Sequence, residues 1–142
     1  MPVFGSQRQP KKLDKKALGA MGERMAAREL RRSGYKILGR NIDTPVGEAD
    51  IVCRAPDRST IVVVEVKTRA VDADNPRPID APELAVGPKK KRTLVAISRA
   101  LAAANGWTDR PMRIDVVAVV MAAGTKPTIR HHINAVTLDD VR

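Results

Sequence analysis

Acidic residues and a lysine are concentrated in two short segments whose other residues are mostly small or β-branched. The first segment begins with Gly47-Glu48-Ala49-Asp50, and the second carries Glu65-Val66-Lys67 near its end. Pro56-Asp57-Arg58-Ser59 lies between them and is typical of a turn, so the pattern predicts a β-hairpin. Carboxylates on adjacent strands could bind Mg²⁺, a hard cation that takes oxygen ligands and keeps several waters for chemistry.

The register of this hairpin decides which charged side chains meet. A turn centred between residues 57 and 58 places Asp50 opposite Glu65, and Glu48 opposite Lys67. Directly opposed side chains have Cβ atoms about 5 Å apart, where like charges repel. The repulsion between Asp50 and Glu65 can be offset by a divalent cation or by a proton shared between the two acids. A longer loop or a bulge would shift this register by one residue and exchange the faces.

The second strand is apolar on both faces, with Ile61 and Val63 on one side and Val62 and Val64 on the other. This pattern predicts a central strand that is covered on both faces. Glu65 and Lys67 then lie where the buried sheet meets its rim, and charges there are costly unless they are paired or bound to metal. A plain ion pair that closes the end of the sheet is the alternative.

A further acid, Glu23, lies in a segment with helical periodicity from Leu13 to Ser33, which Gly34 ends. Its helical neighbours are all small and uncharged, and they are Gly19, Ala20, Ala26 and Ala27. A carboxylate among small residues can be approached closely by another element, so we expect Glu23 to face inward. The alternative is an exposed glutamate at a permissive surface position.

The motifs and their order resemble the YraN family of bacterial endonuclease-like proteins. The residues that carry the resemblance are Gly22-Glu23, Gly34-Tyr35-Lys36-Ile37-Leu38, Arg40-Asn41, Gly47-Glu48-Ala49-Asp50-Ile51-Val52, Val63-Val64-Glu65-Val66-Lys67-Thr68-Arg69, Lys91-Arg92, Arg113-Ile114-Asp115-Val116-Val117 and His132-Ile133-Asn134-Ala135. They cover most of the chain. That family is similar to the PD-(D/E)XK nuclease superfamily, in particular to the archaeal Holliday-junction resolvases.

The resemblance implies that Asp50 and Glu65 are the two acids of the PD-(D/E)XK pattern, that Lys67 is its lysine, and that Glu23 is the acid from the first helix. Ala49 stands where the pattern has proline. The implied activity is hydrolysis of phosphodiester bonds with Mg²⁺ or Mn²⁺. Asp50 and Glu65 would hold the metal, with Glu23 and then Glu48 as further ligands. Because resolvases cut two symmetric strands, the resemblance also implies a homodimer.

The periodicity predicts helices over 13–33 and 88–105, and strands over 35–41, 47–54, 60–69, 112–121 and 128–135. This order favours an α/β fold with a mixed central sheet. The resemblance implies the restriction-endonuclease-like core, α-β-β-β-α-β. We expect residues 1–12 to form a flexible basic segment and residues 13–142 to form a single domain. A mobile loop is expected at about 70–87, where prolines are frequent.

The charge of the chain favours nucleic acid as a partner. It has 26 Lys and Arg against 16 Asp and Glu, a formal net charge of +10 and a pI of about 10.4. Because aromatic residues make up only 2% of the chain, we expect contacts with the backbone and shape of DNA, branched or otherwise structured, and little base stacking. The candidate nucleic-acid-binding residues are Arg69, Lys89, Lys90, Lys91, Arg92, Lys15 and Lys16.

Several other classes of protein are disfavoured. The longest apolar run, residues 116–123, is shorter than the ~20 residues that cross a bilayer, and no secretory signal is expected. Cys53 is the sole cysteine, which fits a reducing cytoplasm. His131 and His132 point to opposite faces of a strand, so they do not easily chelate one ion. Two alternatives to a nuclease remain: a nucleic-acid-binding module that does not cut, and an interaction subunit of a DNA repair or processing assembly.

Overall fold

The structure is a computed structural model that describes residues 14–71 and 86–137. The predicted flexible segment 1–12 and most of the predicted loop at 70–87 lie outside these residues. In chain order the elements are α1 (Lys15–Arg32), β1 (Lys36–Thr44), β2 (Gly47–Arg54), β3 (Ile61–Val71), α2 (Pro88–Asn105), β4 (Met112–Ala122) and β5 (Thr128–Val136). Among the described residues, no helix is long and apolar enough to cross a membrane.

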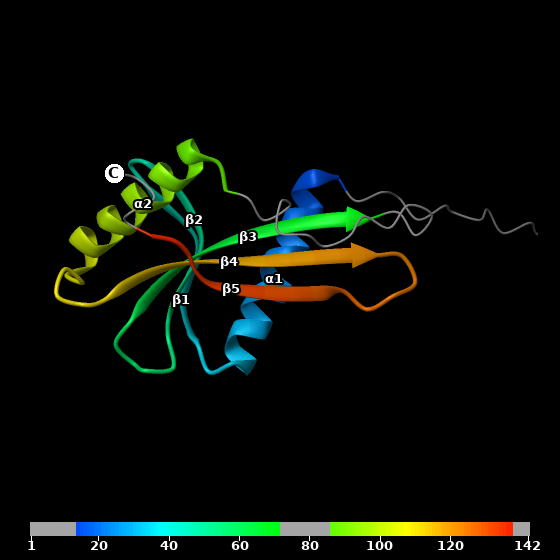
Figure 1. The fold of residues 1–142 in the computed structure, drawn as a ribbon, viewed down its shortest axis with the longest axis horizontal. Helices are drawn as coiled ribbons and strands as arrows, with labels where there is room; N and C mark the ends of the chain where they lie inside the picture. Colours follow the sequence, from blue (N-terminus) through cyan, green and yellow to red (C-terminus); the bar gives the residue numbers. More distant parts are fainter. Residues whose placement is uncertain (1–13, 72–85, 138–142) are drawn as a thin grey trace, which may run out of the picture.

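The five strands, which Figure 1 labels, form one sheet in the order β1-β2-β3-β4-β5. β3 and β4 are parallel, because α2 connects them, and the other neighbours are antiparallel. The predicted α/β fold with a mixed sheet and an α-β-β-β-α-β order is therefore confirmed, with β5 as a further antiparallel strand. β1 runs to Thr44, three residues beyond its predicted end, because Thr44 pairs with Gly47 across a two-residue connection to β2.

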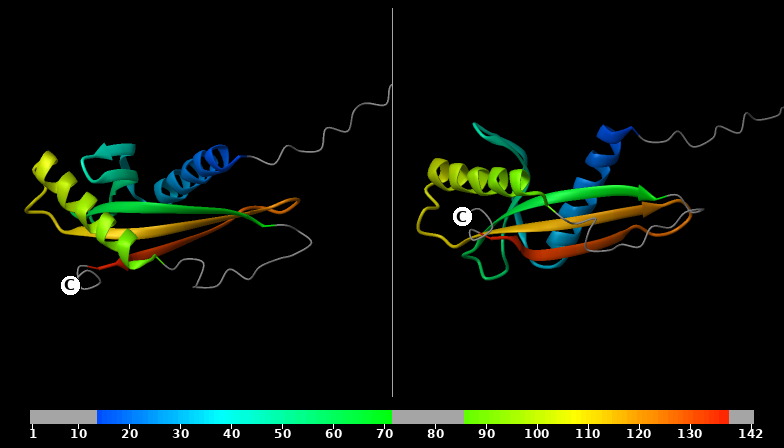
Figure 2. Two further views of the ribbon diagram at one scale, coloured as in Figure 1. Left: turned by 90° about the horizontal axis from the view of Figure 1, so that it is seen from above. Right: turned by 45° about the horizontal axis from the view of Figure 1, so that its top comes forward.

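The two helices cover opposite faces of the sheet (Figure 2). On one face, Leu94 and Ile97 of α2 pack with buried residues such as Val63 of β3. On the other face, Ala26 and Leu30 of α1 pack with a second buried set from β2, β3 and β4. β3 is thus the central, doubly covered strand that its sequence predicts.

The ends of both helices follow from local sequence signals. Asp14 caps α1 by accepting a hydrogen bond from the Ala17 amide at 2.7 Å, and α1 ends before Gly34, whose φ of +89° is in the left-handed region. Pro88 begins α2, and Gly106, with φ of +69°, follows its last residue. These signals fix the N-terminal end of α2, whose first five residues include four cationic ones, at the predicted place.

The β2–β3 hairpin has the predicted register. Its pairs run from Arg54 with Ile61 to Ile51 with Val64. The Asp57 carboxylate stabilises the turn by accepting hydrogen bonds from the backbone and hydroxyl of the residues that follow it. Beyond Ile51 the two strands separate, and this fork is where the acidic residues of the hairpin lie.

Candidate functional site

Asp50 and Glu65 face each other at the fork between β2 and β3. Asp50 follows the last residue of the β2–β3 ladder, and its Oδ2 accepts a hydrogen bond from the backbone N–H of Val66 at 2.9 Å. A side-chain hydrogen bond also joins the carboxyl groups of Asp50 and Glu65. The Asp50 carboxylate therefore accepts the hydrogen bond of a β3 amide that has no backbone partner on β2 in the ladder. This hydrogen bond fixes the Asp50 side chain beside Glu65.

Both carboxyl groups are harder to ionise than in water. Burial raises the pKa of Asp50, although the Val66 amide and the charge of Lys90 oppose this rise. Burial and the negative charge of Asp50 raise the pKa of Glu65, and Lys90 again acts in the opposite direction. Two adjacent, desolvated carboxyl groups are the donor set that a hard divalent cation prefers. The residues present thus fit Mg²⁺ or Mn²⁺.

Glu23 faces inward, as the sequence predicts, and the exposed alternative is wrong. Only 17% of its side chain is exposed, and Oε2 lies 4.0 Å from Nη2 of Arg40. Burial and the charge of Asp50 raise the pKa of Glu23, whereas a hydrogen bond from the Asn41 side chain and the charge of Arg40 lower it. Asn41 adopts a left-handed φ of +49°, which asparagine tolerates better than most residues. Glu23 is therefore oriented by β1 and is close enough to repel Asp50.

The close approach of α1 to β3 explains how Glu23 reaches the fork. A Cβ atom added to Gly22 would lie only 1.8 Å from Oγ1 of Thr68. Because Thr68 is the residue after Lys67 on β3, the contact brings the middle of α1 against the strand that carries the lysine. A side chain at Gly22 would hold the helix away from the sheet and move Glu23 with it.

Lys67 lies two residues after Glu65 and therefore on the same face of β3. Its side chain is partly buried. Burial lowers the pKa of Lys67, as do the charges of Arg69 and Lys90, whereas the charge of Glu65 raises it. The predicted acid and lysine of β3 are thus electrostatically coupled.

Glu48 stands apart from the other acids. It is exposed, and its Cα partner in the sheet is Asp43 of β1. The β2–β3 ladder ends at Ile51 and Val64, so the predicted pairing of Glu48 with Lys67 does not belong to it. The charge of Glu48 does raise the pKa of Glu23. Within residues 14–71 and 86–137, no three His, Cys, Asp or Glu side chains are grouped closely enough to hold a metal ion.

The predicted nucleic-acid-binding residues lie on three elements. Lys15 and Lys16 are exposed in the first turn of α1, and Arg69 is exposed towards the end of β3. The other four follow Pro88 at the start of α2, where only Lys91 is partly buried, and they are Lys89, Lys90, Lys91 and Arg92. One of them has a role that the sequence did not predict: Nζ of Lys90 lies 3.3 Å from Oε1 of Glu65.

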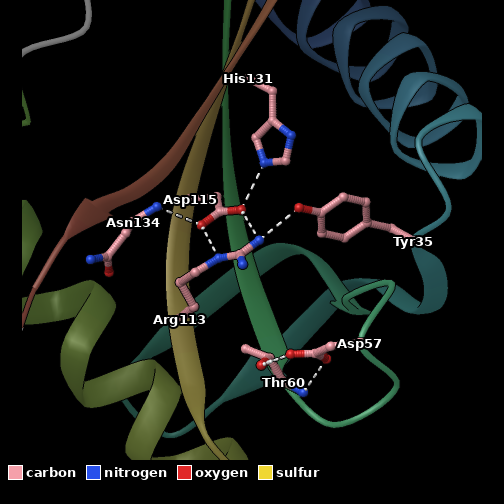
Figure 3. A network of polar contacts seen from close by, with 7 residues as sticks. All are labelled: Tyr35, Asp57, Thr60, Arg113, Asp115, His131 and Asn134. Carbon is pink, nitrogen blue, oxygen red and sulfur yellow. Dashed lines mark hydrogen bonds and ion pairs between the residues drawn. The ribbon is translucent and has the colours of Figure 1, made fainter.

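A second polar network, on the sheet face that α1 covers, surrounds Asp115 (Figure 3). Asp115 is fully buried and accepts hydrogen bonds from Arg113 at 2.8 and 2.9 Å and from the Asn134 backbone at 2.8 Å. Nε2 of His131 lies 2.7 Å from it, and Arg113 also donates to the Tyr35 hydroxyl at 2.7 Å. Burial opposes ionisation, but these hydrogen bonds outweigh it and lower the pKa of Asp115.

This network ties the start of β1 to β4 and β5, and its saturation with internal hydrogen bonds indicates a structural role. Sequence reasoning did not find it, although Arg113 and Asp115 carry a signal. Two charged residues on one face of an apolar strand are costly unless they are paired. His131 joins the network and His132 lies on the other face, as strand alternation predicts.

The comparisons with known proteins concern family and fold. The sequence model of the uncharacterised protein family UPF0102 matches residues 22–119. A UPF0102 protein of Pelobacter propionicus is 36% identical over 140 residues, which is 96% of each chain. A UPF0102 protein of Anaeromyxobacter dehalogenans is 40% identical over 117 residues, or 82% of this chain and 81% of the relative.

Two solved structures are similar at 18% sequence identity over 82% of this chain. One is a crystal structure of a repair endonuclease from Pyrococcus abyssi, with a TM-score of 0.44. The other is a complex of EndoMS with double-stranded DNA, with a TM-score of 0.40. This chain spans 42% and 41% of those chains, less than half of either.

Proposed function

This chain belongs to the UPF0102 (YraN) family, and we propose that it is a metal-dependent nuclease that hydrolyses phosphodiester bonds in DNA. The observation that carries the proposal is the pair formed by Asp50 and Glu65. Burial raises the pKa of both carboxyl groups, and a hydrogen bond joins them at the point where two strands separate. A divalent cation offsets the cost of ionising such a pair, and Mg²⁺ or Mn²⁺ suits its oxygen donors.

Each residue of the site has a role in this proposal. Asp50, which the Val66 amide orients, and Glu65 hold the cation, which supplies a Lewis acid for the scissile phosphate. Lys67 positions the attacking water or stabilises the negative charge that develops on the phosphate. Glu23 orients a water or adds a ligand from the α1 side, and Glu48 is the outermost acid.

The distribution of charge supports DNA as the substrate. Exposed cations lie in the first turns of both helices, where no acidic residue is present. Cations at the positive end of a helix dipole destabilise the helix, so a bound phosphate would stabilise the first turn of α2, which unlike that of α1 has no acidic cap. Recognition through charge and shape favours branched or otherwise structured DNA over a particular sequence.

The test is cleavage of linear, flapped and four-way-junction DNA that share one sequence, with Mg²⁺, Mn²⁺ or EDTA. We expect cutting of at least one substrate with either metal and none with EDTA. Glu65→Gln and Lys67→Ala should lower the rate by two orders of magnitude or more, as removal of metal or charge-stabilising groups commonly does. Equal cutting by wild type and both variants would assign the activity to a contaminant and contradict the proposal.

A nucleic-acid-binding module that does not cut is the second candidate. The observation that favours this candidate is that residues 14–71 and 86–137 contain no group of three His, Cys, Asp or Glu side chains that could hold a metal ion. This candidate predicts tight, salt-sensitive binding of junction DNA, without cutting in any metal. It also predicts that Asp50→Asn and Glu65→Gln leave binding unchanged with or without Mg²⁺.

A further inference from the structure

Lys90 stands against the carboxylate pair without belonging to the strands that carry it. Its ammonium lies 3.3 Å from Oε1 of Glu65, so the first turn of α2 is joined to β3 by an ion pair. The two partners differ in exposure, since 46% of the Lys90 side chain is exposed and only 13% of the Glu65 side chain. The acid is therefore fixed in the fold, whereas the lysine can move into solvent.

The position of Lys90 in α2 indicates that its ion pair stabilises the ionised carboxylates and does not stabilise the helix. A cation in the first turn opposes the helix dipole, and α2 has no acidic residue in that turn. The charge of Lys90 acts on Asp50 as well as on Glu65. A single ammonium thus partly neutralises both members of the pair.

A divalent cation and the Lys90 ammonium would compete for the same oxygens. Each needs the Glu65 carboxylate, and two cations at one carboxylate repel each other. A divalent cation is attracted by two carboxylates at once. The side chain of Lys90 is flexible and half-exposed, so its ammonium can move away from Glu65 into solvent. The charges therefore favour replacement of the Lys90 ammonium by the divalent cation at the Glu65 carboxylate.

We propose that Lys90 is an exchangeable counter-ion of the carboxylate pair formed by Asp50 and Glu65. It neutralises the pair in the metal-free protein and leaves Glu65 when a divalent cation binds. The released ammonium is then available to contact a phosphate of the substrate beside the cation. Metal binding and phosphate binding are therefore coupled through this lysine. This inference rests on the proposed function, because it needs a cation site at the pair.

The test is the affinity of the full chain for Mn²⁺, measured by titration calorimetry without DNA. Lys90→Gln and Lys90→Met, which keeps the apolar stem, should each bind Mn²⁺ about fivefold more tightly than wild type. Fivefold corresponds to the ~1 kcal/mol of a partly exposed ion pair. Arg99→Gln is the matched control, because it removes one exposed positive charge from the same helix away from the pair, and it should change the affinity by less than about twofold.

The outcomes separate the two proposals. If wild type binds Mn²⁺ and Asp50→Asn does not, but both Lys90 variants bind as wild type or more weakly, then the exchange is wrong and the cation site stands. If wild type does not bind Mn²⁺, or Asp50→Asn binds it equally well, then the proposed metal-dependent function fails and the exchange fails with it.

Discussion

Replacement of Gly22 by alanine tests how α1 is held against the sheet. The added Cβ would lie 1.8 Å from Oγ1 of Thr68 and 2.8 Å from its Cβ and Cγ2. Ordinary contact begins at 3.4 Å, so even after rotation of the Thr68 side chain the contact with its Cβ would require helix and strand to separate by about 0.6 Å, the difference between 3.4 and 2.8 Å. Overpacking of this kind costs about 1–3 kcal/mol. The separation should also withdraw Glu23 from Asp50.

Gly19→Ala is the matched control, because it lies one helical turn earlier in α1 and its added Cβ would meet nothing within 4 Å. Both variants gain the ~1 kcal/mol by which alanine exceeds glycine in helix propensity. Gly22→Ala should therefore unfold with a free energy about 1–3 kcal/mol below that of Gly19→Ala. For a chain of this length the difference is about 2–4 °C in Tm per kcal/mol.

The assay is urea denaturation followed by circular dichroism, together with thermal unfolding of the same samples. Adding Thr68→Ala to Gly22→Ala should restore part of the loss, since it removes Oγ1 and Cγ2 and leaves only the Cβ contact at 2.8 Å. If Gly22→Ala is as stable as Gly19→Ala, or if Thr68→Ala gives no rescue, the helix does not contact β3 as described. The placement of Glu23 would then lose its basis.

Three further predictions concern titratable groups. Asp115→Asn should destabilise the protein by ~1–3 kcal/mol at pH 7, because it leaves the partly buried Arg113 without its partner charge. The folded pKa of Asp115 is lowered, so its contribution to the free energy of unfolding is present above the unfolded pKa of about 3.9 and is lost as the pH falls through the folded pKa. Urea denaturation from about pH 7 to about pH 3 should therefore show a steeper loss of stability in wild type than in Asp115→Asn. Glu65 behaves in the opposite way, because its pKa is raised in the folded protein and its ionisation therefore opposes folding. Glu65→Gln should raise the Tm at pH 8 in EDTA. Added Mg²⁺ should raise the Tm of wild type more than that of Glu65→Gln. A Tm of Glu65→Gln below that of wild type at pH 8 would contradict the repulsion between the acids. Burial raises the pKa of the Cys53 thiol to about 12, so iodoacetamide at pH 8 should label Cys53 only in urea; rapid labelling of the native protein would contradict its burial.

Local signals in the sequence were sufficient to predict most of the fold. The bounds predicted for β2 and α2 agree with the structure, because turn residues and Pro88 mark their ends. The register that places Asp50 opposite Glu65 followed from the position of a single turn, and the ladder from Arg54 to Ile51 has that register. The inward orientation of Glu23 followed from the small size of its neighbours.

Contacts between distant segments could not be predicted in the same way. The sequence places Lys90 as a cation near a helix start, but its pairing with Glu65 depends on how α2 crosses the sheet. The ion pair of Arg40 with Glu23, the hydrogen bond from the Asn41 side chain to Glu23 and the hydrogen bond between His131 and Asp115 likewise join separate elements. Side-chain periodicity gives the face on which a residue lies, whereas its partner is set by packing in three dimensions.

The central claim is that Asp50 takes part in the chemistry of DNA cleavage and not in holding the substrate. The most direct measurement compares wild type with Asp50→Asn for Mg²⁺-dependent cleavage and for binding of one four-way junction, with Glu29→Gln as a surface control. We expect Asp50→Asn to bind the junction with an affinity close to that of wild type and to cut it at least a hundredfold more slowly, while Glu29→Gln matches wild type in both. Equal cleavage by Asp50→Asn and wild type would contradict the claim.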